Sequence, residues 1–160
     1  MAKDGRQSEK HSPRMVNRRA RHEYHISEVV ECGIELLGTE VKSLRAGQGK
    51  IDEAYARVKG GEVFLIGANI AMYPQAAEGM QHNPKRDRKL LVRRGQIAQL
   101  ESHVKQKGKT LIPLAIYFKR GWAKCEIGIA EGKQQRDKRD DLRKKDHQRE
   151  IAREMSRRNR

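Results

Sequence analysis

The amino-acid sequence predicts a mainly β protein with short helices, built as a small antiparallel OB-type barrel of five to six strands. Three observations support this fold class: apolar and polar residues alternate over several short segments, tight glycine turns separate neighbouring segments, and only two stretches show helical spacing. The OB-type barrel is the known fold that best fits this pattern. A chain of 160 residues has room for one such domain with extensions. We expect a disordered basic arm over residues 1–16, the barrel over 17–130 and a charged tail over 131–160.

The composition points to a polyanionic partner. Charged residues make up 36% of the chain, aromatic residues only 4%, and the formal net charge is +15. A balance this basic favours nucleic acid first and an anionic membrane surface second. The longest apolar run, Leu111 to Phe118, is much shorter than the roughly 18 residues of a membrane span, so we expect no membrane insertion.

The N-terminal region and the cysteines indicate the compartment. The first residues are polar and basic and lack the apolar segment of a secretory signal. Cys32 and Cys125 lie in strand-like segments. In a chain without an export signal, two reduced and buried thiols are favoured over a disulfide. The sequence therefore predicts a cytoplasmic protein.

The first strand and the helix after it carry the clearest local signals. From Tyr24 to Leu36 apolar residues alternate with polar ones, and Glu28 interrupts the apolar row, which predicts a bulge there. Residues 38–47 then predict a two-turn helix. Thr39 is suited to cap its first amides, and Glu40 suits its positive end. Gly47 supplies a left-handed exit residue. A short helix between strands is expected to cap one end of the barrel.

A hairpin and an irregular connection follow. Residues 54–59 alternate in character, Gly60-Gly61 predicts a two-residue turn, and residues 63–66 are apolar enough to be buried on both faces. Residues 71–88 contain Pro74, Gly79 and Pro84 and predict an irregular connection.

The longer helix and the last two strands complete the predicted barrel. Helical spacing runs from Leu90 to Lys107, and the regular helix is expected to begin close to Gly95. Strands are predicted over Thr110–Lys119 and Trp122–Ala130, joined by a tight turn. Pro113 cannot donate to a ladder, so it indicates an edge or a bulge.

The segment after Ala130 has little apolar surface. Its large aliphatic residues are Leu142, Ile151 and Met155, and lysine and arginine outnumber the acids. Its residues favour helix, but a helix with so small an apolar face is not stable alone. We therefore expect the tail to be disordered until it binds a partner.

Five stretches of the sequence, in order, resemble the SsrA-binding protein (SmpB) family. They are Asn17–Tyr24, Gly38–Gly47, Phe64–Ile70, Arg88–Leu91 and Gly132–Arg139. The resemblance covers nearly everything after residue 16. It is highly specific, because several long segments match in the same order along the chain. It implies the same OB-type barrel.

The resemblance also implies a function in trans-translation, the rescue of stalled bacterial ribosomes. The barrel would bind the tRNA-like domain of transfer-messenger RNA (tmRNA, the SsrA RNA) and support its alanylation by alanyl-tRNA synthetase. The elongation factor for aminoacyl-tRNA would deliver the complex to the 70S ribosome. The tail would sense the decoding centre of the small subunit and fold as a helix in the empty mRNA channel.

Four positions match residues that bind tmRNA in the family: Asn17, Glu31, Leu91 and Lys124. A carboxylate on a basic surface needs a reason to be there, and accepting from base amino groups or ribose hydroxyls is one. A local salt bridge from Glu31 to Arg21 or Lys42 is the alternative. Leu91 would contact a splayed base, although its spacing alone favours a core position.

Charge and neighbourhood add six further candidates for RNA contact: Arg18, Arg19, Arg21, His22, Lys42 and Arg45. Together with Lys124 they would form a continuous phosphate-binding surface. The alternative is an ordinary solvated charge run.

The tail residues expected to contact the ribosome, as the resemblance implies, are Gly132, Lys133, Arg136, Asp137, Lys138, Arg139, Ile151 and Met155. Ile151 and Met155 are four apart and would share one helix edge. The chain departs from the family at Arg136, where histidine or tyrosine is common, and at Glu154, which is often aliphatic. A guanidinium can also stack on a base.

Two other functional classes remain open. A general single-stranded nucleic-acid or ribosomal RNA binder predicts stacking aromatics on the barrel, and the candidates are Tyr55, Tyr73, Tyr117 and Trp122. An RNA-modifying enzyme would use His22 or Glu31 as a general base and predicts a perturbed pKa in a cleft. Because no nucleophile has an evident base partner and no cysteine or histidine pair has ligand spacing, we expect no enzyme, no cofactor and no metal.

Overall fold

The computed structural model describes residues 13–77 and 79–158. In this part of the chain seven strands form the main sheet: β1 (Met15–Val16), β2 (Tyr24–Ile34), β4 (Tyr55–Lys59), β5 (Glu62–Ile66), β7 (Arg88–Leu91), β8 (Lys109–Lys119) and β9 (Trp122–Gly132). A second, two-stranded sheet pairs β3 (Gly49–Lys50) with β6 (Asn69–Ile70). The helices are α1 (Ala20–Glu23), α2 (Gly38–Arg45), α3 (Arg94–Lys105) and α4 (Gln135–Arg158).

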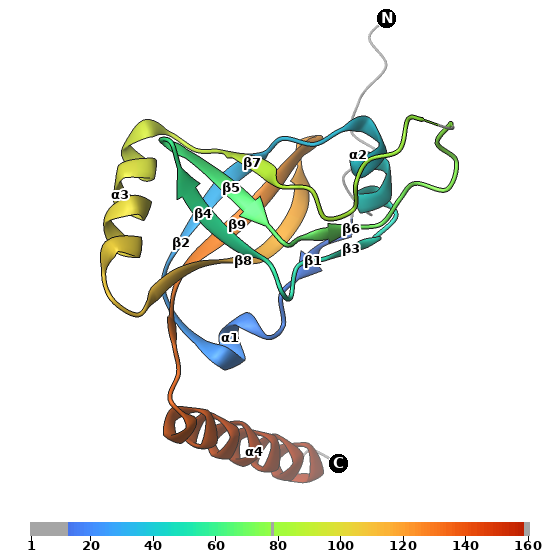
Figure 1. The fold of residues 1–160 in the computed structure, drawn as a ribbon. Helices are drawn as coiled ribbons and strands as arrows, with labels where there is room; N and C mark the ends of the chain where they lie inside the picture. The colour runs from blue at the N-terminus through green and yellow to red at the C-terminus, as the bar shows by residue number, and fades with distance from the viewer. Residues whose placement is uncertain (1–12, 78, 159–160) are drawn as a thin grey trace, which may run out of the picture.

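The main sheet is antiparallel and curls back on itself. Its strand order is β1-β8-β4-β5-β7-β2-β9, and β8 pairs with β9 as well as with β4. These pairings bring the sheet to a near-closed ring, with α3 on one side and α2 at one end (Figure 1). The predicted mixture of antiparallel strands with short helices is confirmed.

The local signals for turns and bulges are confirmed. The register of β2 on β9 shifts between Ile26 and Glu28, and that of β8 on β9 shifts after Pro113. Gly60 and Gly61 have φ of 60° and 73° and close the β4–β5 hairpin. Arg120 also has a positive φ, at the predicted β8–β9 turn. These positions depend on backbone chemistry that one residue determines, so sequence alone locates them.

The regular helix α3 begins at Arg94, close to Gly95 as expected, but two other expectations were wrong. Leu90 and Leu91 belong to strand β7, whereas we expected helical spacing from Leu90 onward. Pairing with β2 and β5 places Leu90 in a ladder, and this tertiary pairing outweighs local spacing. In β5, only Val63 and Leu65 are fully buried, so the strand has one core face and not two.

The core inside the ring is aliphatic. It contains Leu44 from α2 and large side chains from every long strand, among them Leu65, Leu111, Ile116 and Ile127, all less than 2% exposed. Cys32 and Cys125 are both buried and unbridged, as expected. They lie directly opposite each other on β2 and β9.

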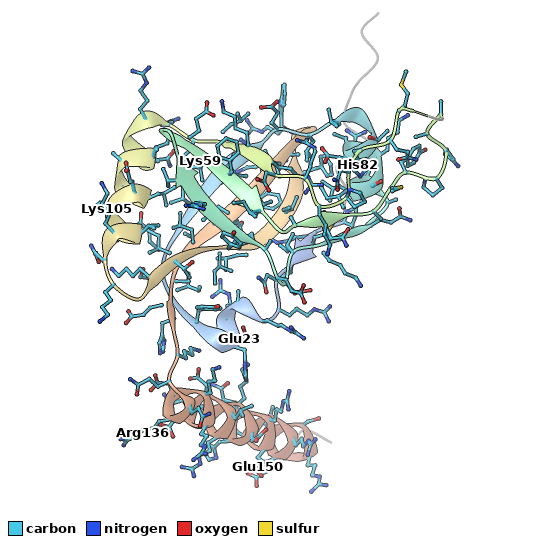
Figure 2. The ribbon with its side chains drawn as sticks, in the orientation of Figure 1. Glu23, Lys59, His82, Lys105, Arg136 and Glu150 are labelled. Carbon is cyan, nitrogen blue, oxygen red and sulfur yellow. The ribbon has the colours of Figure 1, made fainter. Side chains whose placement is uncertain are left out.

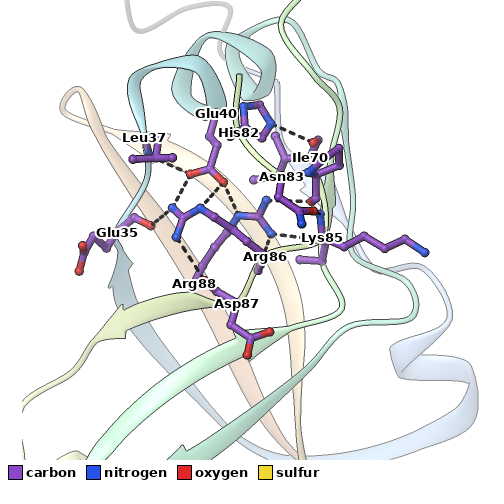
Figure 3. Close-up of polar contacts among 12 residues, drawn as sticks. Glu35, Leu37, Glu40, Ile70, His82, Asn83, Lys85, Arg86, Asp87 and Arg88 are labelled. Carbon is purple, nitrogen blue, oxygen red and sulfur yellow. Dashed lines mark hydrogen bonds and ion pairs between the residues drawn. The ribbon is translucent and has the colours of Figure 1, made fainter. Parts of the chain in front are cut away.

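A buried ion cluster attaches α2 to the strand β7 segment (Figure 3). Glu40 and Arg88 are both fully buried, and Arg88 Nε donates to Glu40 Oε1 at 2.9 Å. Arg86 donates to both carboxylate oxygens, and the Leu37 amide donates to Oε2 at 2.7 Å. Arg88 also donates to the carbonyls of Ala68, Arg86 and Pro84. The sequence analysis placed Glu40 only at the positive end of this helix, so its role in a buried cluster was missed.

Thr39 and His82 make a second contact, between α2 and the loop that joins β6 to β7. The Thr39 hydroxyl lies 2.8 Å from His82 Nδ1, and His82 Nε2 lies 3.0 Å from the Ile70 carbonyl oxygen. The N-cap of α2 is Leu37, whose amide donates to Glu40, and Thr39 lies inside the first turn, so the expected Thr39 cap is not formed. The hydroxyl is used by the loop instead. Together with the ion cluster, this contact fixes α2, and the turn at Gly47 that follows it, at one end of the ring.

The N-terminal boundary of the fold differs from the predicted one. Residues 1–12 lie outside the described residues. Met15 and Val16 form β1 on the edge of β8, and Met15 is buried in the core, so the arm as predicted extends too far into the fold. The cause is Met15 itself, whose apolar side chain fills the core beside Leu44 and Gly49.

The tail forms helix α4 and leaves from the end of β9. Lys133, the first residue after β9, links α1 to α4: its amide donates to the Glu23 carbonyl, and its Nζ donates to the Arg21 carbonyl at 2.8 Å and to Asp141. Charged side chains surround α4, Arg136 and Glu150 among them (Figure 2). Across the described residues, no helix is both long and apolar enough to cross a membrane.

Candidate nucleic-acid interface

One outward face of the sheet collects charged and aromatic side chains from three neighbouring strands. Its members are Glu31 on β2, Lys124 and Glu126 on β9, and Tyr117 and Lys119 on β8; we call it the outer β2–β9–β8 face. Glu31 lies opposite Glu126, and Tyr117 lies opposite Lys124. Side chains alternate along a strand, so the burial of Cys125 and Ile127 turns Lys124 and Glu126 outward.

Glu31 is held by neighbours that the sequence analysis did not name. Tyr117 Oη donates to Glu31 Oε2 at 2.5 Å, and Lys119 Nζ lies 3.0 Å from the same oxygen. The hydrogen bond from Tyr117 and then the contact with Lys119 lower the pKa of the Glu31 carboxyl. The expected alternative partners, Arg21 and Lys42, are not its partners. Glu31 is still partly exposed, so its carboxylate is accessible from solvent.

An apolar groove adjoins this face. Leu91 is 54% exposed and packs against Gly33, which lies opposite it on β2. Trp122, at the β8–β9 turn, is 75% exposed. These two side chains line the groove together with Lys124, Phe118 and Val41. Leu91 is therefore a surface residue, as its predicted role requires and contrary to what its spacing suggested. A groove with apolar walls and a lysine at its edge suits an unstacked base with its phosphate.

Two of the six charge-based candidates lie on α2, at the same end of the ring as the groove. The Arg45 guanidinium lies 5.3 Å from the centre of the Phe118 ring, and Lys42 Nζ lies 5.2 Å from that of Tyr73. Both side chains are exposed. They extend the positive charge of Lys124 and Lys119 along this end of the molecule.

The other four candidates lie elsewhere. Arg18, Arg19, Arg21 and His22 are exposed on and before α1, which adjoins the first residue of β2. Glu31 lies seven residues further along the strand, which corresponds to roughly 20 Å. Figure 1 shows α1 and α2 at different ends of the molecule. The expected continuous basic surface is therefore divided into two basic regions.

Asn17 is buried, unlike the other three positions matched to the family. It is 4% exposed, and its amide group donates to the carbonyls of Ile51 and Pro113. Its Oδ1 accepts from the amides of Arg19 and Ala20 at 3.1 and 3.0 Å. All the hydrogen-bonding groups of the side chain are thus used inside the protein. Asn17 shapes the segment that carries Arg18 and Arg19.

Replacing Asn17 with alanine is expected to lower the free energy of unfolding by about 2–4 kcal/mol, because buried carbonyls and amides lose their partners. Chemical denaturation monitored by circular dichroism measures this. Asn83→Ala is the matched control, since Asn83 is exposed and accepts a single hydrogen bond, from the Lys85 amide. Equal losses for the two variants would show that the Asn17 network adds nothing.

The four candidate stacking aromatics do not form one platform. Trp122 lines the groove beside Leu91, whereas Tyr55 lines a separate cavity with Asn17. Tyr117 directs its hydroxyl to Glu31, and Tyr73 lies under Lys42. Within the described residues, no three histidine, cysteine, aspartate or glutamate side chains are placed to hold a metal ion.

The tail candidates have a common origin at the far end of β9. Gly132 pairs with Tyr24, and Arg136, Lys138 and Arg139 lie in the first turns of α4. Asp137 lies 3.6 Å from the His25 ring. Ile151 and Met155 are exposed on the same helix. Eight residues of β9 separate Lys124 from Gly132, roughly 25 Å, so the groove and the tail lie at opposite ends of this strand.

Comparison with known proteins gives consistent matches. The model of the family described as SmpB protein matches residues 14–157. An SsrA-binding protein of Microcystis aeruginosa is 48% identical over 88% of this chain and 92% of its own length. One from Acetivibrio thermocellus is 50% identical over 87% and 90% of the two chains. One from Thermobifida fusca is 43% identical over 99% of both.

A solved structure is also similar. A chain from work described as "tmRNA-SmpB: a journey to the center of the bacterial ribosome" superimposes with a TM-score of 0.65. Its sequence is 47% identical, and the match covers 77% of the present chain and 86% of that chain.

Proposed function

The chain belongs to the SmpB family, and from this premise we propose that it binds the tRNA-like domain of tmRNA and delivers that RNA to stalled ribosomes for trans-translation. The observation that carries the proposal is the position of the groove and the tail at opposite ends of β9. An adaptor between an RNA and the ribosome needs two separate binding regions. SmpB proteins are RNA-binding proteins without enzymatic activity, so the chain is not an enzyme, in agreement with the sequence analysis.

The proposed tmRNA site combines the outer β2–β9–β8 face, the groove and α2. Lys124, Lys42 and Arg45 supply positive charge to the phosphate backbone, and this attraction falls as salt rises. Leu91 and Trp122 offer apolar surface to an unstacked base, and Glu31 offers an acceptor. Asn17 contributes indirectly, because its side chain holds the backbone of the segment that carries Arg18 and Arg19. The near-closed ring fits an OB-type barrel, a fold that binds oligonucleotides on its sheet surface.

The proposed ribosomal region begins where the core ends, at residue 131. Its first residues, Gly132, Lys133, Arg136, Asp137, Lys138 and Arg139, would enter the decoding centre of the small subunit. The rest of α4 would occupy the empty mRNA channel, with Ile151 and Met155 on its apolar edge. We infer that this helix is stable only when the RNA that lines the mRNA channel surrounds it, because most of its residues are polar or charged. The arginines on and before α1 lie at the same end as the tail and would add phosphate contacts there.

Within the proposal, alanyl-tRNA synthetase and the elongation factor for aminoacyl-tRNA act on the RNA that this protein holds, in the cytoplasm. A general binder of single strands is the second candidate, because Trp122 is an exposed stacking surface beside Lys124. The two candidates differ in selectivity.

We expect the full chain to bind the tRNA-like domain of tmRNA at least about tenfold more tightly than an ordinary tRNA at near-physiological salt, a difference of about 1.4 kcal/mol. Filter binding or fluorescence anisotropy measures both affinities. Lys124→Glu should weaken binding strongly, whereas Lys59→Glu, the same charge change on the β4–β5 hairpin (Figure 2), should have little effect. Equal, steeply salt-dependent binding to both RNAs would support the general binder instead.

A further inference from the structure

Tyr117 occupies a central position on the outer β2–β9–β8 face, and the proposed function gives it no role of its own. Its hydroxyl donates to Glu31 Oε2, and its ring lies beneath the Arg14 guanidinium, 4.6 Å from carbon to ring centre. Arg14 in turn donates to Glu126 Oε2 at 2.6 Å. A side chain from the start of the described chain, one from β8 and one from β2 therefore form a single row.

The second contact of Glu31 is of a different kind. Lys119 Nζ lies 3.0 Å from Oε2 and 3.3 Å from Oε1. A lysine is a point charge on a flexible stem, and it balances charge without setting a direction. The Tyr117 phenol is rigid and half-buried, and Arg14 covers one side of its ring. Of the two contacts, the hydrogen bond from Tyr117 is the one that can orient the carboxylate.

The two oxygens of Glu31 differ in how many donors they already accept. Oε2 accepts from both Tyr117 and Lys119, whereas Oε1 accepts only the longer contact from Lys119 among the described residues. A carboxylate oxygen has room for about two donors. Oε1 can therefore accept from a ribose hydroxyl or a base amino group while Oε2 stays anchored.

An unanchored glutamate would serve this purpose poorly. It would sample several rotamers on a surface that also contains Lys124, and binding would have to restrict them. Burial and then the hydrogen bond to Glu31 raise the pKa of Tyr117, so the phenol keeps its proton and remains a donor across the physiological range. The carboxylate remains ionised, since its pKa is lowered.

We propose that Tyr117 is a positioning residue for RNA recognition: it fixes Glu31 so that Oε1 accepts a hydrogen bond from a hydroxyl or amino group of the bound RNA. Arg14 supports Tyr117 by stacking on its ring. This inference rests on the proposed function, because it assigns a role within the same tmRNA site. It also gives the segment before the barrel a part in binding that does not require contact with phosphate.

The test is Tyr117→Phe in the full chain, which removes the hydroxyl and keeps the ring under Arg14. We expect affinity for the tRNA-like domain of tmRNA to fall about tenfold, the lower end of the range for the loss of a hydrogen bond to a charged group. The slope of log affinity against log salt should not change, because no phosphate contact is lost. Tyr55→Phe is the control, since Tyr55 lies on β4 and lines a different cavity.

A double-mutant cycle with Glu31→Gln separates positioning from general structure. If Tyr117 acts through Glu31, adding Tyr117→Phe to Glu31→Gln should cost little more than Glu31→Gln alone, with thermal midpoints matching within error. Additive losses, unchanged affinity of Tyr117→Phe, or a loss explained by a lower folded fraction would each overturn the inference. Failure of the proposed function appears separately, as equal binding of the unmodified chain to tmRNA and ordinary tRNA.

Discussion

Glu40→Gln is expected to lower the free energy of unfolding by about 3–5 kcal/mol, because it leaves the fully buried Arg88 without its counter-charge. The midpoint of thermal unfolding should fall on the order of 10 °C for a chain of this size. The cluster joins α2 to β7, so the substitution should destabilise the packing of α2 on the end of the ring and not only the start of one helix. Thermal unfolding followed by circular dichroism measures the effect.

Acid provides a second measurement on the same cluster. Burial alone would raise the pKa of Glu40, but the hydrogen bonds from Arg86 and Leu37 and the charge of Arg88 outweigh it, and the pKa is lowered from 4.5. A carboxyl with a lowered pKa contributes stability above its unfolded-state pKa and loses it as the pH falls through the folded-state value. The unmodified protein should therefore lose stability below about pH 4.5, and Glu40→Gln should lose less over that interval.

Glu101→Gln is the matched control, because among the described residues the Glu101 carboxylate makes only an exposed pair with Lys105, within α3. Its effect should stay below about 0.5 kcal/mol. If Glu40→Gln were no more damaging than this control, the buried cluster would have no net importance for stability.

Much of the fold could be predicted because single residues determine it. Gly60-Gly61 predicts a hairpin turn, and Pro113 predicts an edge or a bulge, which the register shift after Pro113 resolves as a bulge. Alternation in β2 and β9 likewise identifies the inward row, since one face of each strand must be apolar. Such signals are local, and a local pattern is what a sequence displays directly.

The remaining features depend on which distant segments meet. Leu90 is a strand residue only because β5 and β2 lie on either side of it. Glu40 is buried only because Arg86 and Arg88, more than forty residues later, neutralise it. Neither residue carries a mark in its own neighbourhood that distinguishes it from an exposed helix residue.

The candidate site follows the same division. Resemblance to the family located Glu31, Leu91 and Lys124, and the structure places all three at one end of the sheet. Charge alone suggested a single basic surface, but charge does not reveal that α1 and α2 lie at different ends. Tyr117 was considered only for stacking, because its hydrogen bond to Glu31 crosses from β8 to β2 and spans 86 positions in sequence.

A chain that ends at Gln134 is expected to bind the tRNA-like domain with its selectivity intact and to lose tagging on stalled ribosomes completely. This end point keeps β9 whole and preserves the bond from Lys133 to the Arg21 carbonyl, so the near-closed ring should remain folded. Residues 135–160 contain eleven Lys and Arg and six Asp and Glu, a net charge of +5, so the truncated chain retains +10. General affinity for RNA should fall modestly, and a tagging assay with stalled ribosomes measures the second effect.

Charge and sequence must be separated before the lost activity is assigned to the tail. A full-length chain with residues 135–160 in shuffled order keeps the charge of the tail but breaks the spacing of Ile151 and Met155 and the order of Asp137, Lys138 and Arg139. If the tail acts as a fitted helix, the shuffled chain should bind tmRNA normally and still fail to tag. If the shuffled chain tags like the original, the tail is only a source of positive charge, and a sensor of the empty mRNA channel is excluded. If the truncated chain loses selective tmRNA binding, the groove and the tail are not independent regions, and the division of the protein along β9 is wrong.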